Sequence, residues 1–163
     1  MTGDPCGVSR VVLDRSSVTF ALLGGALVVA GGIVAAVNSA APFAHGSWLA
    51  AYLVLVAGIS QVLLGVGRLA LPFREPSRRL MRAQLLLWNA GSVAVPAGVL
   101  GDAALPVTAG SVALLAALAC FSAGVREVPL GAGAVAYHAL IVALAGSVIV
   151  GSALAGAAPG DWL

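Results

Sequence analysis

Three polar side chains lie inside otherwise apolar stretches of the chain, and they are the residues that could carry chemistry. Gln61 lies seven residues before Arg68, and Asn89 lies seven residues after Arg82. His138 lies about six residues into the last apolar stretch. At about 1.5 Å per helical residue, all three would lie about 10 Å below the same membrane boundary. Polar groups in lipid turn toward the interior of a bundle, so the spacing predicts a shared layer, either a structural network or a small-ligand site.

The two histidines are candidate haem ligands, because imidazole is a common axial ligand of haem iron. His45 is expected at the outer edge of the membrane and His138 in the inner third, about 20 Å apart along the membrane normal. One haem cannot bridge that separation within a monomer. His138 alone could be an axial ligand, although a lone histidine is more often structural. No cofactor is therefore predicted, and haem at His138 is kept as an alternative.

The sequence patterns of common catalytic sites are absent. No Asp, Glu, Lys or Arg falls inside an apolar stretch, and neither HExxH nor GxSxG occurs. Proton relays and ion-coupled carriers usually need charge at that depth, so a channel or transporter is the weaker alternative. Cys6 and Cys120 have no metal-binding spacing, and no metal site is predicted. We therefore do not expect an enzyme.

Composition identifies the elements that must position these residues. The 163 residues are 61% hydrophobic and 9% charged, whereas a soluble domain carries about 25% charged residues. About 20 apolar residues cross the hydrocarbon as a helix. We predict an all-α integral membrane bundle of five transmembrane helices, at about 17–38, 47–67, 83–101, 104–124 and 132–156. A polar segment, 1–16, precedes this single domain, and a tail, 157–163, follows it. Trp48 and Tyr52 are expected at the headgroup level.

The arginines predict the orientation. Five of the eight lie in one stretch between the second and third spans: Arg68, Arg74, Arg78, Arg79 and Arg82. The others precede the first span or lie between the fourth and fifth. Basic short loops stay on the cytoplasmic side, so the N-terminus is expected in the cytoplasm and the C-terminus outside, in the inner (cytoplasmic) membrane. Because the arginines flank spans, nucleic acid is not an expected partner.

Small residues recur at helical spacing in the first and last spans and predict close helix packing. In the first span they are Gly24, Gly25, Gly31 and Gly32, and in the last they are Ala139, Ala143, Ser147, Gly151 and Ala155. A stripe of this kind lets the backbone of another helix approach closely. The last span is therefore a predicted packing surface, for this bundle or for a partner.

The Arg-only, Ala/Gly/Val-rich composition resembles small multi-pass membrane proteins of high-GC bacteria, and this resemblance implies no activity. The His45-Gly-Ser-Trp start of the second span faintly resembles helix openings of haem-copper oxidase core subunits, but the second expected ligand is missing. The leading interpretation is a non-catalytic membrane component: a small accessory subunit, assembly factor or scaffold. It would lie in the lipid bilayer with a membrane-protein partner or as a homo-oligomer. The alternative is a small-molecule or haem-binding module built on the polar layer.

Overall fold

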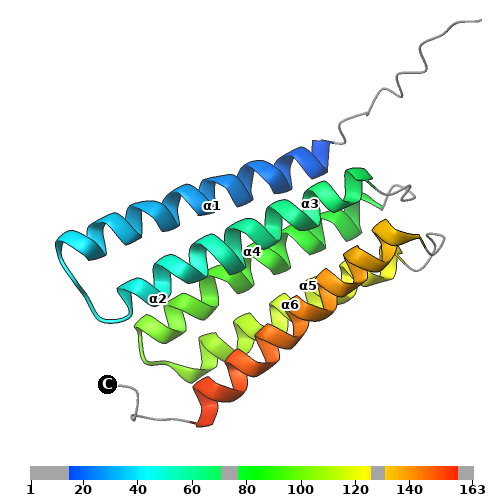
Figure 1. The fold of residues 1–163 in the computed structure, drawn as a ribbon. Coiled ribbons are helices and arrows are strands. Elements are labelled where there is room, and N and C mark those ends of the chain that lie inside the picture. The colour runs from blue at the N-terminus through cyan, green and yellow to red at the C-terminus, as the bar shows by residue number, and fades with distance from the viewer. Residues whose placement is uncertain (1–14, 71–76, 126–130, 158–163) are drawn as a thin grey trace, which may run out of the picture.

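The computed structural model describes residues 15–70, 77–125 and 131–157, and this part of the chain is all helical. Its elements are α1 (Arg15–Ala40), α2 (Gly46–Ala51), η1 (Tyr52–Ile59), α3 (Ser60–Ala70), α4 (Arg78–Leu100), α5 (Ala104–Val125) and α6 (Ala132–Ala157). The segments α2, η1 and α3 follow one another without a break and form one long helix, the α2–η1–α3 helix. The prediction of an all-α fold is confirmed, and five helices are long and apolar enough to cross a membrane (Figure 1).

α4 begins at Arg78, five residues before the predicted start of the third span. Ser77 causes the early start, because its Oγ accepts a hydrogen bond from the Leu80 amide at 3.2 Å and so caps the helix. Hydropathy alone assigned these basic residues to a loop. Several residues on which the sequence analysis relied lie outside the described part of the chain: Cys6, Arg74, the tail from residue 158 onward, and two of the remaining arginines, Arg10 and Arg126.

Neighbouring helices run antiparallel, and α1 and α6 lie at different edges of the bundle (Figure 1). α1 packs along the α2–η1–α3 helix, α4 packs most closely against α5, and α6 packs mainly against α5. The first two helices meet the last three through a sparser interface, between α3 and α6 and between η1 and α4. The two edge helices are the least covered: 17% of an apolar 18-residue stretch in each is buried, against 39% of such a stretch in α4.

Glycines account for the closest helix pairs. A Cβ atom added at Gly24 would lie 2.7 Å from the Gly58 carbonyl oxygen, and one added at Gly91 would lie 2.7 Å from the Gly110 carbonyl oxygen. Any larger residue would therefore push the backbones apart, which is the reason small residues mark helix contacts in membranes. Gly31 makes a similar contact with Val54, whereas Gly25 and Gly32 have no atom within 4 Å of an added Cβ.

An aromatic cluster joins the two parts of the bundle. Phe20 of α1 meets Phe121 of α5 edge to face, with ring centroids 5.5 Å apart. The Arg68 guanidinium lies 5.1 Å from the centre of the Phe121 ring, a cation–π geometry. The Tyr137 hydroxyl donates to the Leu64 carbonyl oxygen at 3.2 Å, across from α6 to α3. These contacts place the large side chains near the ends of the helices that carry the arginines.

The described arginines lie at one end of the bundle, which we call the arginine end. Arg68 lies near the end of α3, and Arg78, Arg79 and Arg82 lie in the first turns of α4. The opposite end consists of the 41–45 loop and the 101–103 turn. His45 (φ 63°) and Asp102 (φ 48°) adopt left-handed backbone conformations there, which suits tight connections. The Asn38 side chain accepts from the Phe43 amide and donates to Ser47 Oγ, both at 3.1 Å, and so holds this loop.

Candidate interior site

The three residues of the predicted polar layer differ in their surroundings. Gln61 is fully buried, and its carboxamide makes no hydrogen bond with the described residues. Asn89 is half-buried, and its Nδ2 donates to the Leu85 carbonyl oxygen of its own helix at 2.8 Å. His138 is also half-buried, with Nδ1 2.9 Å from the Ala134 carbonyl oxygen of its own helix. Gln61 therefore hydrogen-bonds neither of the other two, and a shared ligand at this layer stays a prediction.

Sequence reasoning missed a second buried carboxamide, Gln84. Its side chain is 0% exposed and makes no hydrogen bond with the described residues. Gln84, Trp88, Ser92 and Pro96 recur every four residues along α4, and all four are buried. That spacing marks one helical face, so it could have identified Gln84. Asn89, which drew attention by its polarity, lies at the edge of this face.

Tyr52 was expected at the headgroup level, but it is buried. Its ring stacks on the exposed Trp48, with centroids 5.3 Å apart. Its hydroxyl interacts with the Ser92 hydroxyl across from η1 to α4, although the contact falls short of good hydrogen-bond geometry and neither oxygen has another partner among the described residues. An aromatic residue near a helix end can face either lipid or a neighbouring helix. Tyr52 faces the neighbouring helix α4, which carries Ser92.

Five buried residues of the α2–η1–α3 helix and of α4 are called the polar column: Tyr52, Gln61, Gln84, Trp88 and Ser92. Each has a buried side-chain nitrogen or oxygen without a hydrogen bond to the described residues. Since Tyr52 faces Ser92 and the helices are antiparallel, Gln61, nine residues after Tyr52, lies at the depth of Gln84, eight residues before Ser92. The column is uncharged. It can donate and accept hydrogen bonds but cannot act as an acid or base at neutral pH.

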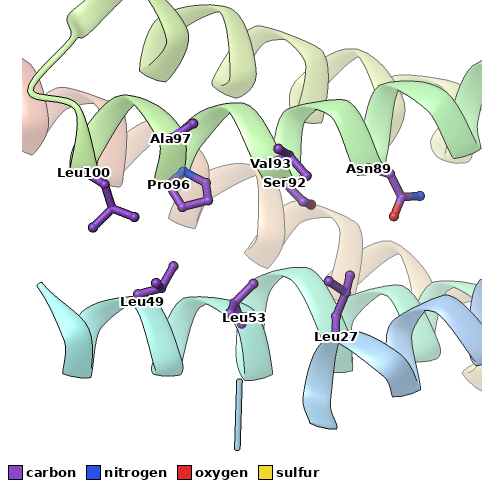
Figure 2. A pocket seen from close by; sticks show the side chains of 9 residues that line it. All are labelled: Leu27, Leu49, Leu53, Asn89, Ser92, Val93, Pro96, Ala97 and Leu100. Atoms are coloured by element: carbon purple, nitrogen blue, oxygen red, sulfur yellow. The ribbon is translucent and has the colours of Figure 1, made fainter. Parts of the chain in front are cut away.

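A groove of about 340 Å³ adjoins this column on the side away from the arginines. Leucines from α1, α2 and η1 form one wall, and α4 forms the other (Figure 2). The lining residues are Leu27, Leu49, Leu53, Asn89, Ser92, Val93, Pro96, Ala97 and Leu100. Apart from Asn89 and Ser92, every one of them is apolar, and the Ser92 hydroxyl oxygen is itself buried.

Leucine, valine and alanine together make up most of the groove lining. Phe20, Phe121 and Tyr137 fill the bundle near the arginine end, while Tyr52 is buried beside Ser92 in the other half. The π-helical segment η1 contributes one wall, and Ser60 at its end donates to the Leu55 carbonyl oxygen at 2.8 Å. Segments of π-helix often occur at functional sites. No sequence signal, such as an internal proline, indicated this one.

The histidines lie at opposite ends of the bundle. His45 is exposed and begins α2 from a left-handed conformation, while His138 lies near the start of α6, at the arginine end. Among the described residues, no three His, Cys, Asp or Glu side chains gather into a group that could hold a metal ion.

The predicted small-residue stripe of α6 lies on its outer face. Ala139, Ala143, Ser147 and Gly151 are all exposed, and a Cβ added at Gly151 would meet no atom within 4 Å. The side chain of Ala155, the last member, lies outside the described residues. Within the described bundle this stripe therefore packs against no other helix, in contrast to Gly24 of α1 and Gly91 of α4.

Comparison with known proteins adds no functional information: no family model matches the chain, and no curated protein or solved structure matches it significantly.

Proposed function

We propose that this protein is a non-catalytic component of a membrane complex that docks to a partner membrane protein through the outer face of α6. It would cross the membrane five times, with the N-terminus in the cytoplasm and the C-terminus outside. The arginine distribution supports this orientation, because basic segments at helix ends stay on the cytoplasmic side. The five apolar helices support the membrane location.

The contrast between filled and open small-residue positions carries the proposal. At Gly91, a neighbouring backbone occupies the space that a side chain would need, with the Gly110 oxygen 2.7 Å from an added Cβ. At Gly146 and Gly151 of α6 that space is open to 4 Å. Small residues favour helix association because they let dispersion contacts form between close backbones. An open stripe at the edge of the bundle is therefore available to a helix from another chain.

The outer face of α6 is also apolar enough to stay in the membrane. Val142, Ile149 and Val150 flank the stripe, and each is more than half exposed. A partner helix would fit along the small residues and contact these larger side chains on either side. This arrangement is the one that small-residue helix pairs use in bilayers.

Site-specific photo-crosslinking in native membranes tests the proposal. A photoreactive amino acid replaces Ala143 in the middle of the stripe, and in a separate variant it replaces Val112, an exposed residue of α5. We expect a discrete protein adduct from position 143 and lipid adducts from position 112. Introducing Gly151→Leu about two helical turns from the probe, on the same stripe, should reduce the protein adduct at least about tenfold, because a larger side chain separates the helices.

Val150→Leu is the matched control, since it changes a neighbouring exposed residue that is already large. An adduct of twice the chain mass would identify a second copy as the partner, and an adduct of another mass a different subunit. Lipid adducts alone at position 143, or a protein adduct that Gly151→Leu leaves unchanged, would rule out docking at this face.

A further inference from the structure

The exposed side of α4 changes from charged to apolar along the helix. Exposed residues recur there every three or four positions, a spacing that marks one side of a helix: Arg79, Arg82, Leu86, Ala90, Val93, Ala97 and Leu100. Arg78 is also exposed and lies about one turn before Arg82. Leu86 is 68% exposed and Val93 is 66% exposed. Three guanidinium groups therefore lie in line with an open apolar stripe on the same helix.

The arginine cluster, which consists of Arg78, Arg79 and Arg82, carries charge that the described residues do not neutralise. None of its guanidinium groups forms an ion pair or a hydrogen bond with the described residues. Among these residues the only carboxylate is that of Asp102, at the opposite end of the bundle (Figure 1). Glu75, the acid nearest to the cluster in sequence, lies outside the described residues. The cluster therefore presents three positive charges at an exposed surface.

The length of α4 places the arginine cluster where the hydrocarbon of a membrane begins. Residues 83–100 carry no charged side chain, and as a helix they rise about 27 Å, close to the hydrocarbon thickness of about 30 Å. From Arg82 to Val93 the helix rises roughly 16 Å, which is close to the depth of one leaflet, about 15 Å. The head of a lipid that packs along Leu86 and Val93 would therefore lie at the level of Arg82.

We propose that this side of α4 binds an anionic phospholipid, one whose head carries a phosphate and no cationic group. The phosphate lies at the arginine cluster, and an acyl chain lies along Leu86, Ala90 and Val93. The site belongs to the leaflet at the arginine end, which the proposed topology assigns to the cytoplasmic side. It involves α4 and not α6, so lipid binding here and docking at α6 can be tested separately.

Charge complementarity selects this lipid. A guanidinium group can donate two parallel hydrogen bonds to a phosphate, and each arginine near a membrane surface favours anionic lipid roughly fivefold. A head that also carries an ammonium group, as in phosphatidylcholine, would bring a positive charge close to three others. A soluble phosphate could make the same hydrogen bonds, but it lacks the chains that hold a lipid head at this depth.

Native mass spectrometry of the full chain tests the site by counting the lipids that the protein retains. The purified protein in detergent is titrated with equal amounts of phosphatidylglycerol and phosphatidylcholine that have the same acyl chains. We expect phosphatidylglycerol to be retained at least about tenfold more than phosphatidylcholine, with one molecule bound first. An excess of inorganic phosphate should reduce this retention by less than about twofold.

Substitution of single arginines separates the site from the general effect of positive charge. Arg82→Gln should lower retention of phosphatidylglycerol about fivefold, and replacing all three arginines of the cluster with glutamine should abolish the preference. Arg68→Gln is the matched control, because it removes the same charge at the same end from a guanidinium that lies over the Phe121 ring. It should change retention by less than about twofold. Thermal melting shows which variants fold, and Arg79→Gln replaces Arg82→Gln if that variant does not.

Equal retention of the two lipids by the parent protein would overturn the proposal. An equal loss in Arg68→Gln and Arg82→Gln would reduce the effect to net charge and overturn the site on α4. Displacement by inorganic phosphate would show an anion site without a lipid, which also contradicts the proposal.

Discussion

At the level of single residues, buried polar side chains affect the free energy of unfolding in opposite ways, depending on whether they are hydrogen-bonded. Gln61 and Gln84 are fully buried, and their carboxamides have no partner among the described residues, whereas the buried Tyr137 donates to the Leu64 carbonyl oxygen. An unpaired buried polar group costs about 1–3 kcal/mol, while a made hydrogen bond contributes about 0.5–1.5 kcal/mol. Replacement by an apolar residue of similar size should therefore have opposite effects at the two kinds of position.

The first prediction follows from that difference. Gln61→Leu and Gln84→Leu should each raise the free energy of unfolding by roughly 1–3 kcal/mol in detergent, because each removes an unpaired amide without changing volume much. Tyr137→Phe, the matched control, should lower it by about 0.6–1.7 kcal/mol, as expected for an interhelical hydrogen bond in a membrane protein. Chemical denaturation measures all three. A loss of stability in both glutamine variants would mean that the carboxamides pair with each other.

The second prediction concerns Asn89 and His138. Each bonds a carbonyl oxygen of its own helix, so the two should contribute independently. Asn89→Leu and His138→Leu should add within about 0.5 kcal/mol in a double-mutant cycle. An absorbance scan of the parent protein checks for haem in the same samples. A coupling energy above 1 kcal/mol would instead support the shared polar layer that was predicted from their equal depth.

At the level of helices, small residues serve two purposes that the sequence does not distinguish. Gly91 lies against the backbone of α5, and Gly151 lies on the open face of α6. Both belong to similar runs of glycine and alanine, and spacing alone cannot tell which face turns inward. The difference arises only when the helices assemble, because α6 contacts mainly α5 and leaves its opposite side uncovered.

The third prediction uses this pair. Gly91→Leu should lower the free energy of unfolding of the isolated chain by at least about 1–3 kcal/mol, because overpacking a close contact forces the backbones apart. Gly151→Leu should change it by less than about 0.5 kcal/mol, as for other surface substitutions. Thermal denaturation in detergent, at a concentration where the chain is monomeric, makes the comparison. Equal destabilisation by the two would place α6 in a different packing arrangement.

The fold follows from the sequence more completely than the site does. Runs of about 20 apolar residues specify five helices because the hydrocarbon core demands that length, and Ser77 moved one boundary only by a few residues. Gln84 was missed, and the burial of Tyr52 was not predicted, for a different reason. Whether a polar or aromatic side chain faces lipid or a neighbouring helix depends on how the helix is rotated about its axis. The four-residue spacing of Gln84, Trp88 and Ser92 shows that they share one face, but it does not say which way that face points. The π-helical register of η1 depends on packing and left no pattern in the sequence.

At the scale of the whole molecule, the charges and the fold divide the bundle into two halves. Near the arginine end, aromatic side chains fill the interior and tie α1, α3, α5 and α6 together. In the opposite half lies the groove, lined mainly by leucine, valine and alanine. The tightly packed half holds the helices in place, and α6 at the edge of the bundle leaves its outer face uncovered.

The last prediction tests the orientation of this arrangement in the membrane. Because Ser77 caps α4, a cysteine there would disturb the helix, so Gly131 and Ala44 are better positions. Both are exposed, and they lie at the arginine end and at the opposite end respectively. In a background with Cys6 and Cys120 replaced, a membrane-impermeant maleimide should label Ala44→Cys in intact cells and Gly131→Cys only after permeabilisation. The positive-inside rule gives this result because all described arginines lie at the end that includes Gly131. The reverse pattern would invert the proposed topology and place the groove in the cytoplasmic half of the membrane.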